Sequence, residues 1–184
     1  MTIDPALRAR LESVLRPLYQ DLDGVSRFDD VERVEAMARR FYSGDDLAFE
    51  LLLLFHALGR WLEKVGNLSR AVLTTGLSEG ELRATATSIR HLDKPSTDAE
   101  RAVAAALLID SAGVRGLAER LARSRREGSS VFDVVRQALA DAEEPAWLPA
   151  SARPMLAIRR ESRREMCRRI LDETDFTRRR EDAK

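Results

Sequence analysis

The feature that most constrains this chain is the spacing of its apolar residues, which follow a helical period along almost its whole length. No stretch shows the sustained two-residue alternation that is typical of a half-buried strand. Hydrophobic residues make up 44% of the 184 residues, which is enough to bury one core without disulfides or metals as supports. The sequence therefore predicts an all-α fold and a single domain over residues 1–184.

One segment, residues 47–65, is predicted to be the central helix of the fold. Its apolar residues surround the helix instead of forming one stripe, which is typical of a helix buried on most sides. A bend is expected at residues 110–116, where two glycines weaken the helical pattern, and a polar loop is expected at residues 123–130. Capping signals mark three helix starts: Asp4 before Pro5, Ser78 with Glu81, and Thr97 with Glu100.

Composition excludes several classes of protein. The 31 basic residues balance the 31 acidic ones, whereas a dedicated nucleic-acid binder normally has a basic excess. The single cysteine, Cys167, excludes a disulfide framework and a multi-cysteine zinc site. The longest run of large apolar residues, residues 51–55, is far too short to span a bilayer. We therefore expect a cytoplasmic protein with no membrane partner and no nucleic-acid partner.

Arginine pairs recur at helical spacing in the predicted last helix. The pattern favours a solvated helix face, with Glu161 and Glu165 forming ion pairs one turn away. A phosphate-binding or nucleic-acid-binding face is the alternative, although no aromatic residues are interleaved with the arginines to stack on bases. The residues concerned are Arg159, Arg160, Arg163, Arg164, Arg168 and Arg169.

Four segments, in order, resemble the HD superfamily of metal-dependent phosphohydrolases. Residues 30–34, Asp-Val-Glu-Arg-Val, are similar to that family's His-x-x-Arg-Val opening, and residues 53–60, Leu-Leu-Phe-His-Ala-Leu-Gly-Arg, to its Leu-Leu-His-Asp-Ile-Gly-Lys/Arg segment. Residues 84–91 resemble a helix that ends in a histidine in several members, and residues 106–110 the segment that closes with the last metal-ligand aspartate. The resemblance implies an HD-domain-like helical bundle, of the small bacterial type, around a buried central helix.

The same resemblance implies a degraded metal site. The family holds one or two divalent metals with a first histidine, an adjacent histidine and aspartate, and a distal aspartate. Here Asp30 stands in the first place, His56 is retained, Ala57 replaces the aspartate and Asp110 is retained. Because alanine offers no lone pair to a cation, we expect the two-metal centre to be lost.

Two functions follow from this interpretation. In the first, the protein is no longer an enzyme, needs no cofactor, and binds a small anionic ligand or a protein partner, a second copy of the chain included. The candidate ligand-binding residues are Arg33, Arg60, His91 and Arg115. In the second, Asp30, His56 and Asp110 hold one manganese, iron or zinc ion, and the protein is a mononuclear phosphohydrolase acting on nucleotides or other phosphate esters.

Each candidate ligand residue also has a structural interpretation. His56 can be a core histidine that is hydrogen-bonded to a backbone carbonyl or a carboxylate. Asp30 can be a helix N-cap. Asp110 follows an apolar run, so its ionised carboxylate needs a partner, which Arg115, Arg90 or His56 could supply without a metal.

Overall fold

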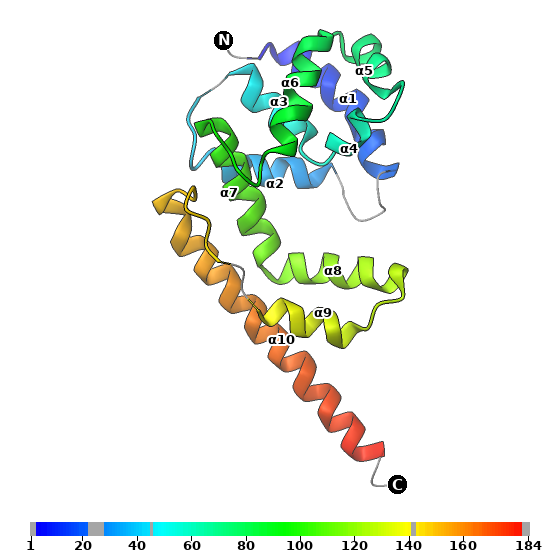
Figure 1. The fold of residues 1–184 in the computed structure, drawn as a ribbon, viewed down its shortest axis with the longest axis vertical. Coiled ribbons are helices and arrows are strands. Elements are labelled where there is room, and N and C mark those ends of the chain that lie inside the picture. The colour runs from blue at the N-terminus through cyan, green and yellow to red at the C-terminus, as the bar shows by residue number, and fades with distance from the viewer. Residues whose placement is uncertain (1–2, 22–27, 45, 141–142, 182–184) are drawn as a thin grey trace. The chain divides into compact units, whose positions relative to one another are not determined.

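The computed structural model describes residues 3–21, 28–44, 46–140 and 143–181, and only the backbone of residues 20–21 and 174–181. Over these ranges the regular structure is entirely helical, and no strand is present (Figure 1). The predicted all-α class is confirmed. No helix among the described residues is both long enough and apolar enough to cross a membrane.

The chain forms two compact units, Met1–Ala106 and Leu107–Lys184, with helix α7 continuing through the boundary. The sequence predicts one domain, and that assignment stays a prediction. The first unit contains α1 (Pro5–Asp21), α2 (Asp29–Ala38), α3 (Leu47–Phe55), α4 (Gly59–Leu62), α5 (Asn67–Thr75), α6 (Glu79–Arg90) and the start of α7 (Asp98–Ala112). The second contains the end of α7, α8 (Val114–Glu127), α9 (Val131–Leu139), a 3-10 turn (Ala150–Ala152) and α10 (Arg153–Glu181).

Helix α3 is the buried centre of the first unit. Every residue from Phe49 to Phe55 is buried, and α1, α2 and α6 all pack against this helix (Figure 1). Leu11 of α1 and Leu82 of α6 are fully buried in the same core cluster. The prediction of a helix that is buried on most sides is confirmed for this part of the chain.

The predicted length of that helix is wrong. Helix α3 ends at Phe55, the chain turns, and α4 begins at Gly59. Leu58 and Leu62 still enter the core after the turn, so the apolar pattern continues although the helix does not. Val65, predicted to lie in the buried helix, is fully exposed. Apolar periodicity cannot detect a turn when both flanking segments pack on one core.

The three predicted helix starts are confirmed because they depend on contacts within a few residues. At each start a side-chain oxygen accepts a hydrogen bond from a backbone amide of the first turn, which otherwise has no partner in the helix. The three bonds are Ala6 N to Asp4 Oδ1 at 3.0 Å, Glu81 N to Ser78 Oγ at 3.2 Å, and Glu100 N to Thr97 Oγ1 at 3.1 Å.

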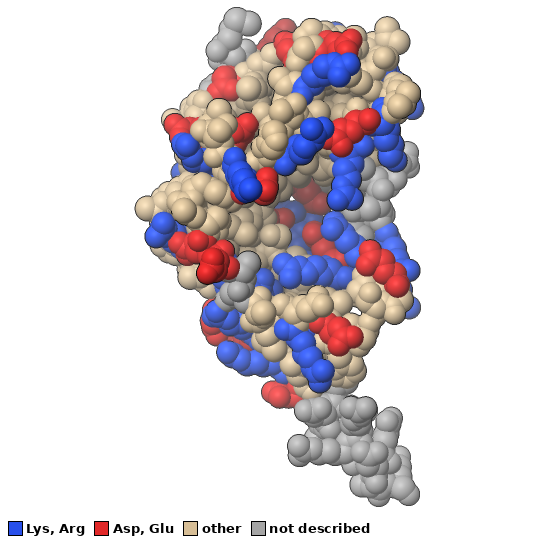
Figure 2. Space-filling view, viewed as in Figure 1, with Lys and Arg blue, Asp and Glu red and all other residues tan. Residues whose placement is uncertain are grey.

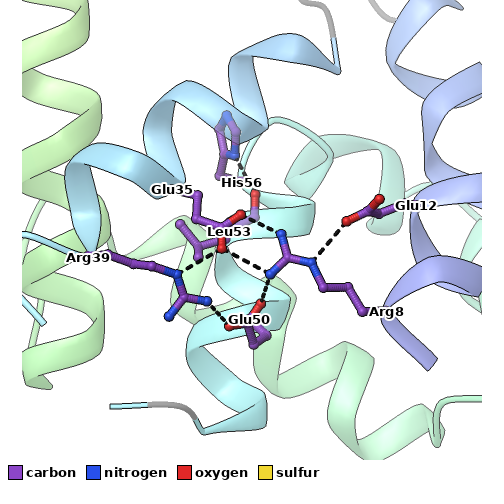
Figure 3. Close-up of polar contacts among 7 residues, drawn as sticks. All are labelled: Arg8, Glu12, Glu35, Arg39, Glu50, Leu53 and His56. Carbon is purple, nitrogen blue, oxygen red and sulfur yellow. Dashed lines mark hydrogen bonds and ion pairs between the residues drawn. The ribbon is translucent and has the colours of Figure 1, made fainter. Parts of the chain in front are cut away.

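A charged network joins α1, α2 and α3 (Figure 3). The Glu50 carboxylate on α3, whose side chain is 3% exposed, accepts a hydrogen bond from Arg8 Nη1 at 2.6 Å and another from Arg39 Nη2. Both arginines also bind Glu35 of α2, and Arg8 reaches Glu12 at 2.9 Å. Two guanidinium groups therefore compensate the charge of a carboxylate that is buried in the core.

The second unit packs α8, α9 and α10 around a smaller core of Leu117, Val135, Ala138 and Cys167. The predicted bend is confirmed, because α7 ends at Ala112 and α8 begins after Gly113. A Cβ atom at Gly116 would lie only 1.9 Å from the Ser111 carbonyl oxygen, so the bend requires a glycine there.

Two further predictions concern the second unit. The polar loop expected at residues 123–130 is wrong for residues 123–127, because α8 continues to Glu127. The C-cap residue is Gly128, whose backbone is in the left-handed region. Charged residues with good helix propensity extend the helix beyond its apolar stripe. The ion pairs expected on the last helix are confirmed by the Glu161–Arg164 contact at 3.0 Å and the Glu165–Arg169 contact at 2.5 Å.

Candidate functional site

The turn between α3 and α4 forms one wall of a surface groove of about 540 Å³ in the first unit. Helix α6 forms the opposite wall. We call this the α4–α6 groove, and it is lined by His56, Ala57, Gly59, Arg60, Glu63, Ala86, Ile89 and Arg90. The segment that carries the family resemblance, from His56 to Arg60, thus lines a groove of the size that small ligands occupy.

Gly59 allows the two walls to approach each other. A Cβ atom at this position would lie 2.7 Å from Cγ2 of Ile89 on α6. Any larger residue would therefore push α4 away from α6 or displace Ile89 from the groove.

His56 is the C-cap residue of α3 and is half-buried. Its Nδ1 lies 2.8 Å from the carbonyl oxygen of Leu53 (Figure 3). Because a carbonyl oxygen can only accept, Nδ1 carries a hydrogen, and the lone pair of the neutral ring lies on Nε2. The interpretation of His56 as a histidine hydrogen-bonded to a backbone carbonyl is confirmed, although the ring lies at the edge of the core.

Tyr19 of α1 lies in the core beside His56, with ring centroids 6.1 Å apart. The Tyr19 side chain is completely buried, and its hydroxyl donates a 2.9 Å hydrogen bond to the Leu54 carbonyl. Burial raises the pKa of Tyr19, a hydrogen bond with the Ala57 backbone opposes this, and the charge of Asp30 raises it further. Tyr19 is therefore a neutral donor that binds the end of α3 from within the core.

Asp30 lies in the first turn of α2, and its interpretation as an N-cap is wrong. The helix begins at Asp29, and the residue at the N-cap position is Phe28. The Asp30 carboxylate forms an ion pair with Arg33 at 3.0 Å, one turn along the same helix. The predicted metal ligand thus binds one of the predicted ligand-binding arginines, and its charge also stabilises the start of the helix.

The α4–α6 groove carries more positive than negative charge. Arg60 is exposed, and none of the described ion pairs includes it. Arg90 binds Glu63, which also lines the groove, with Nε–Oε1 and Nη2–Oε1 distances of 2.9 and 2.5 Å. On the face of the molecule shown in Figure 2, both basic and acidic side chains are scattered over the surface. Two guanidinium groups around one carboxylate suit an anionic ligand.

The other predicted ligand-binding residues lie outside this groove. His91 is the exposed C-cap residue of α6, one position beyond the groove-lining Arg90, and one residue turns a helical side chain by about 100°. Arg33 lies on α2. Arg115 belongs to the second unit, where its Nε lies 4.0 Å from Asp110 and 2.9 Å from Glu119. The predicted ion pair between Asp110 and arginine is confirmed.

The donors of the groove do not fit a two-metal centre. Ala57, at the position where the family resemblance implies a bridging aspartate, offers no ligand, and the charged neighbours in the groove include Arg60 and Arg90. Among the described residues, no group of three or more His, Cys, Asp or Glu side chains is placed to hold a metal ion. Asp30 and His56 belong to the first unit and Asp110 to the second, so their joint metal site stays a prediction.

The ion pair between Glu63 and Arg90 was not identified from the sequence. They are 27 positions apart and come together only because α4 packs on α6. Glu50 was also missed, although one signal pointed to it: it is the only acidic residue in an otherwise apolar segment, and a buried carboxylate needs a cation.

Comparison with known proteins supports the fold alone. No family model matches the chain, and no curated protein matches it. The fold is similar to a crystal structure of a protein from Lactobacillus plantarum that was solved as a structural genomics target, with a TM-score of 0.63 and 18% sequence identity. The match covers 95% of this chain and 99% of that one.

Proposed function

We propose that this protein is an HD-like domain that has lost phosphohydrolase activity and binds a small phosphate-bearing ligand in the α4–α6 groove. One observation carries the proposal. Ala57, where the resemblance implies a metal-bridging aspartate, lines a groove together with Arg60 and Arg90. The Ala57 methyl group offers no ligand to a cation, whereas the two guanidinium groups that line the same groove suit an anion.

The chemistry of the groove favours phosphate over other anions. Each guanidinium group presents several N–H donors in a planar fork, which matches the oxygen spacing of a phosphate group. The hydrogen on His56 Nδ1 binds a backbone carbonyl, so the ring presents its other edge to its surroundings. The volume of about 540 Å³ suits a small molecule better than a protein segment. We place the protein in the cytoplasm, where a free thiol such as the buried Cys167 remains reduced.

Titration of the ¹⁵N-labelled full-length protein with inorganic phosphate, followed by NMR, tests this proposal. We expect chemical-shift changes in the amides of residues 56–63 and 86–91. Arg60→Met should bind phosphate at least about tenfold more weakly, because a charge-assisted hydrogen bond contributes about 1.5–3 kcal/mol. The matched control is Arg70→Met, an exposed arginine on α5 that lies outside the groove. Equal effects of the two substitutions would show non-specific attraction.

The alternative function, a mononuclear metal-dependent phosphohydrolase, makes the opposite prediction. Protein purified without chelators would then contain stoichiometric manganese, iron or zinc, and Asp110→Asn would remove the metal. It would also cleave a generic phosphodiester at a rate that depends on His56. Either result would replace the binding proposal with an enzymatic one.

A further inference from the structure

Glu63 and Arg90 form an ion pair at the boundary between two grooves. The α4–α6 groove lies on one side of the pair. On the other side is a groove of about 660 Å³, formed by residues 62–69 and the outer face of α6, which we call the α5–α6 groove. Glu63, Ala86 and Arg90 line both grooves, so the ion pair is accessible to a small ligand from either side.

The geometry of the pair is that of an anion bound to arginine. Nε and Nη2 of Arg90 both donate to the same oxygen, Glu63 Oε1. These two donors form one edge of the guanidinium plane, the same edge that binds two oxygens of a phosphate group. The Glu63 carboxylate therefore occupies donors that a phosphate ligand could use.

The pair can also be displaced. The Glu63 and Arg90 side chains are 41% and 60% exposed. Glu63 is the C-cap residue of α4, whereas Arg90 is the last residue of α6. Exposed ion pairs of this kind add little to stability. A phosphate dianion carries twice the charge of the carboxylate and has more acceptor oxygens, so it would bind Arg90 more strongly than Glu63 does.

From these observations, and on the basis of the proposed function, we infer that Glu63 is an internal competitor for the ligand at Arg90, and that the ligand carries a dianionic phosphate monoester group. Binding then replaces the Glu63–Arg90 contact by a phosphate–Arg90 contact, with Arg60 on the same groove as the second cation. Glu63 lowers the affinity of the site for the ligand, because the ligand must displace the Glu63 carboxylate from Arg90 before it binds there.

The test compares Glu63→Gln with a matched control, Glu79→Gln. Glu79 also lines the α5–α6 groove and forms an ion pair with an arginine, Arg83, at 2.5 Å, but it does not contact Arg90. Both substitutions remove one negative charge from an exposed ion pair. The readouts are the dissociation constant for inorganic phosphate at pH 7.5 and low ionic strength, and the midpoint of thermal unfolding.

We expect Glu63→Gln to bind phosphate about two- to fivefold more tightly, which is the range that the loss of an exposed ion pair allows. Glu79→Gln should change the dissociation constant by less than about twofold, because it removes only the screened repulsion between an exposed carboxylate and the bound phosphate. Both variants should unfold at nearly the temperature of the unmodified protein.

Unchanged or weaker phosphate binding by Glu63→Gln would overturn the inference, as would equal tightening by Glu79→Gln. If the unmodified protein still binds phosphate through Arg60 in that case, the proposed function stands and only the role of Glu63 is wrong. If neither the unmodified protein nor Glu63→Gln binds phosphate, both proposals fail.

Discussion

The charged network around Glu50 should be the most sensitive polar feature of the first unit. Replacement by glutamine keeps the shape of the side chain, but its amide nitrogen cannot accept a hydrogen bond. One of the bonds from Arg8 and Arg39 is therefore lost, and the other is no longer charge-assisted on both sides. A hydrogen bond to a charged group contributes about 1.5–3 kcal/mol, so we expect Glu50→Gln to lower the free energy of unfolding by about 2–4 kcal/mol.

The matched control is Glu12→Gln. Glu12 also binds Arg8, at 2.9 Å, but its side chain is 34% exposed against 3% for Glu50. Solvent screens the exposed pair, and we expect a loss below about 1 kcal/mol. The contrast between two glutamates on the same arginine isolates the effect of burial.

Urea unfolding followed by tryptophan fluorescence provides the measurement. The protein has two tryptophans, Trp61 in the first unit and Trp147 in the second. A Trp147→Phe background makes the signal report on the first unit alone, which matters because two units need not unfold together. If Glu50→Gln costs no more than Glu12→Gln at an unchanged urea dependence, the reasoning about the buried network is refuted.

Two other predictions concern packing and pH. Gly59→Ala should destabilise the first unit by about 1–3 kcal/mol, since its Cβ would lie 2.7 Å from Ile89 Cγ2. The control is Gly80→Ala at an exposed position of α6, which should be neutral or slightly stabilising in the same urea assay. Equal effects would refute the close approach. Burial opposes ionisation of Glu100, but hydrogen bonds from Ser88, Ser96 and Thr97 outweigh it and lower its pKa from 4.5 to about 2. Its stabilisation, about 3 kcal/mol, should be complete above pH 4.5 and disappear as the pH falls toward 2. The stability difference between the unmodified protein and Glu100→Gln, measured from pH 2 to 6, should therefore grow with pH, and a constant difference would contradict this assignment.

The sequence predicts the features of this fold that depend on neighbouring residues. The capping oxygens of Asp4, Ser78 and Thr97 lie within three residues of the amides they bind, so their motifs are sufficient to locate the helix starts. The end of α3 could not be located in this way. Leu58 and Leu62 return to the same core after the turn, so the apolar pattern continues past Phe55.

The candidate site was predictable only in part, for the same reason. His56, Ala57 and Arg60 line the groove as neighbours in one segment, and a resemblance to a known motif was sufficient to select them. The opposite wall comes from α6, and there Arg90 lines the groove while the predicted His91 does not. A shift of one residue on a helix changes the direction of the side chain, and only the packing of α6 on α4 determines which residue lines the groove.

The most direct test of the central claim, that position 57 lies in an anion site and no longer in a cation site, is to titrate Ala57→Asp with inorganic phosphate. A carboxylate in the α4–α6 groove would repel a bound dianion by roughly 1–3 kcal/mol, so phosphate should bind to Ala57→Asp about fivefold or more weakly than to the unmodified protein. Unchanged phosphate affinity would contradict the claim, because residue 57 would then lie away from the ligand.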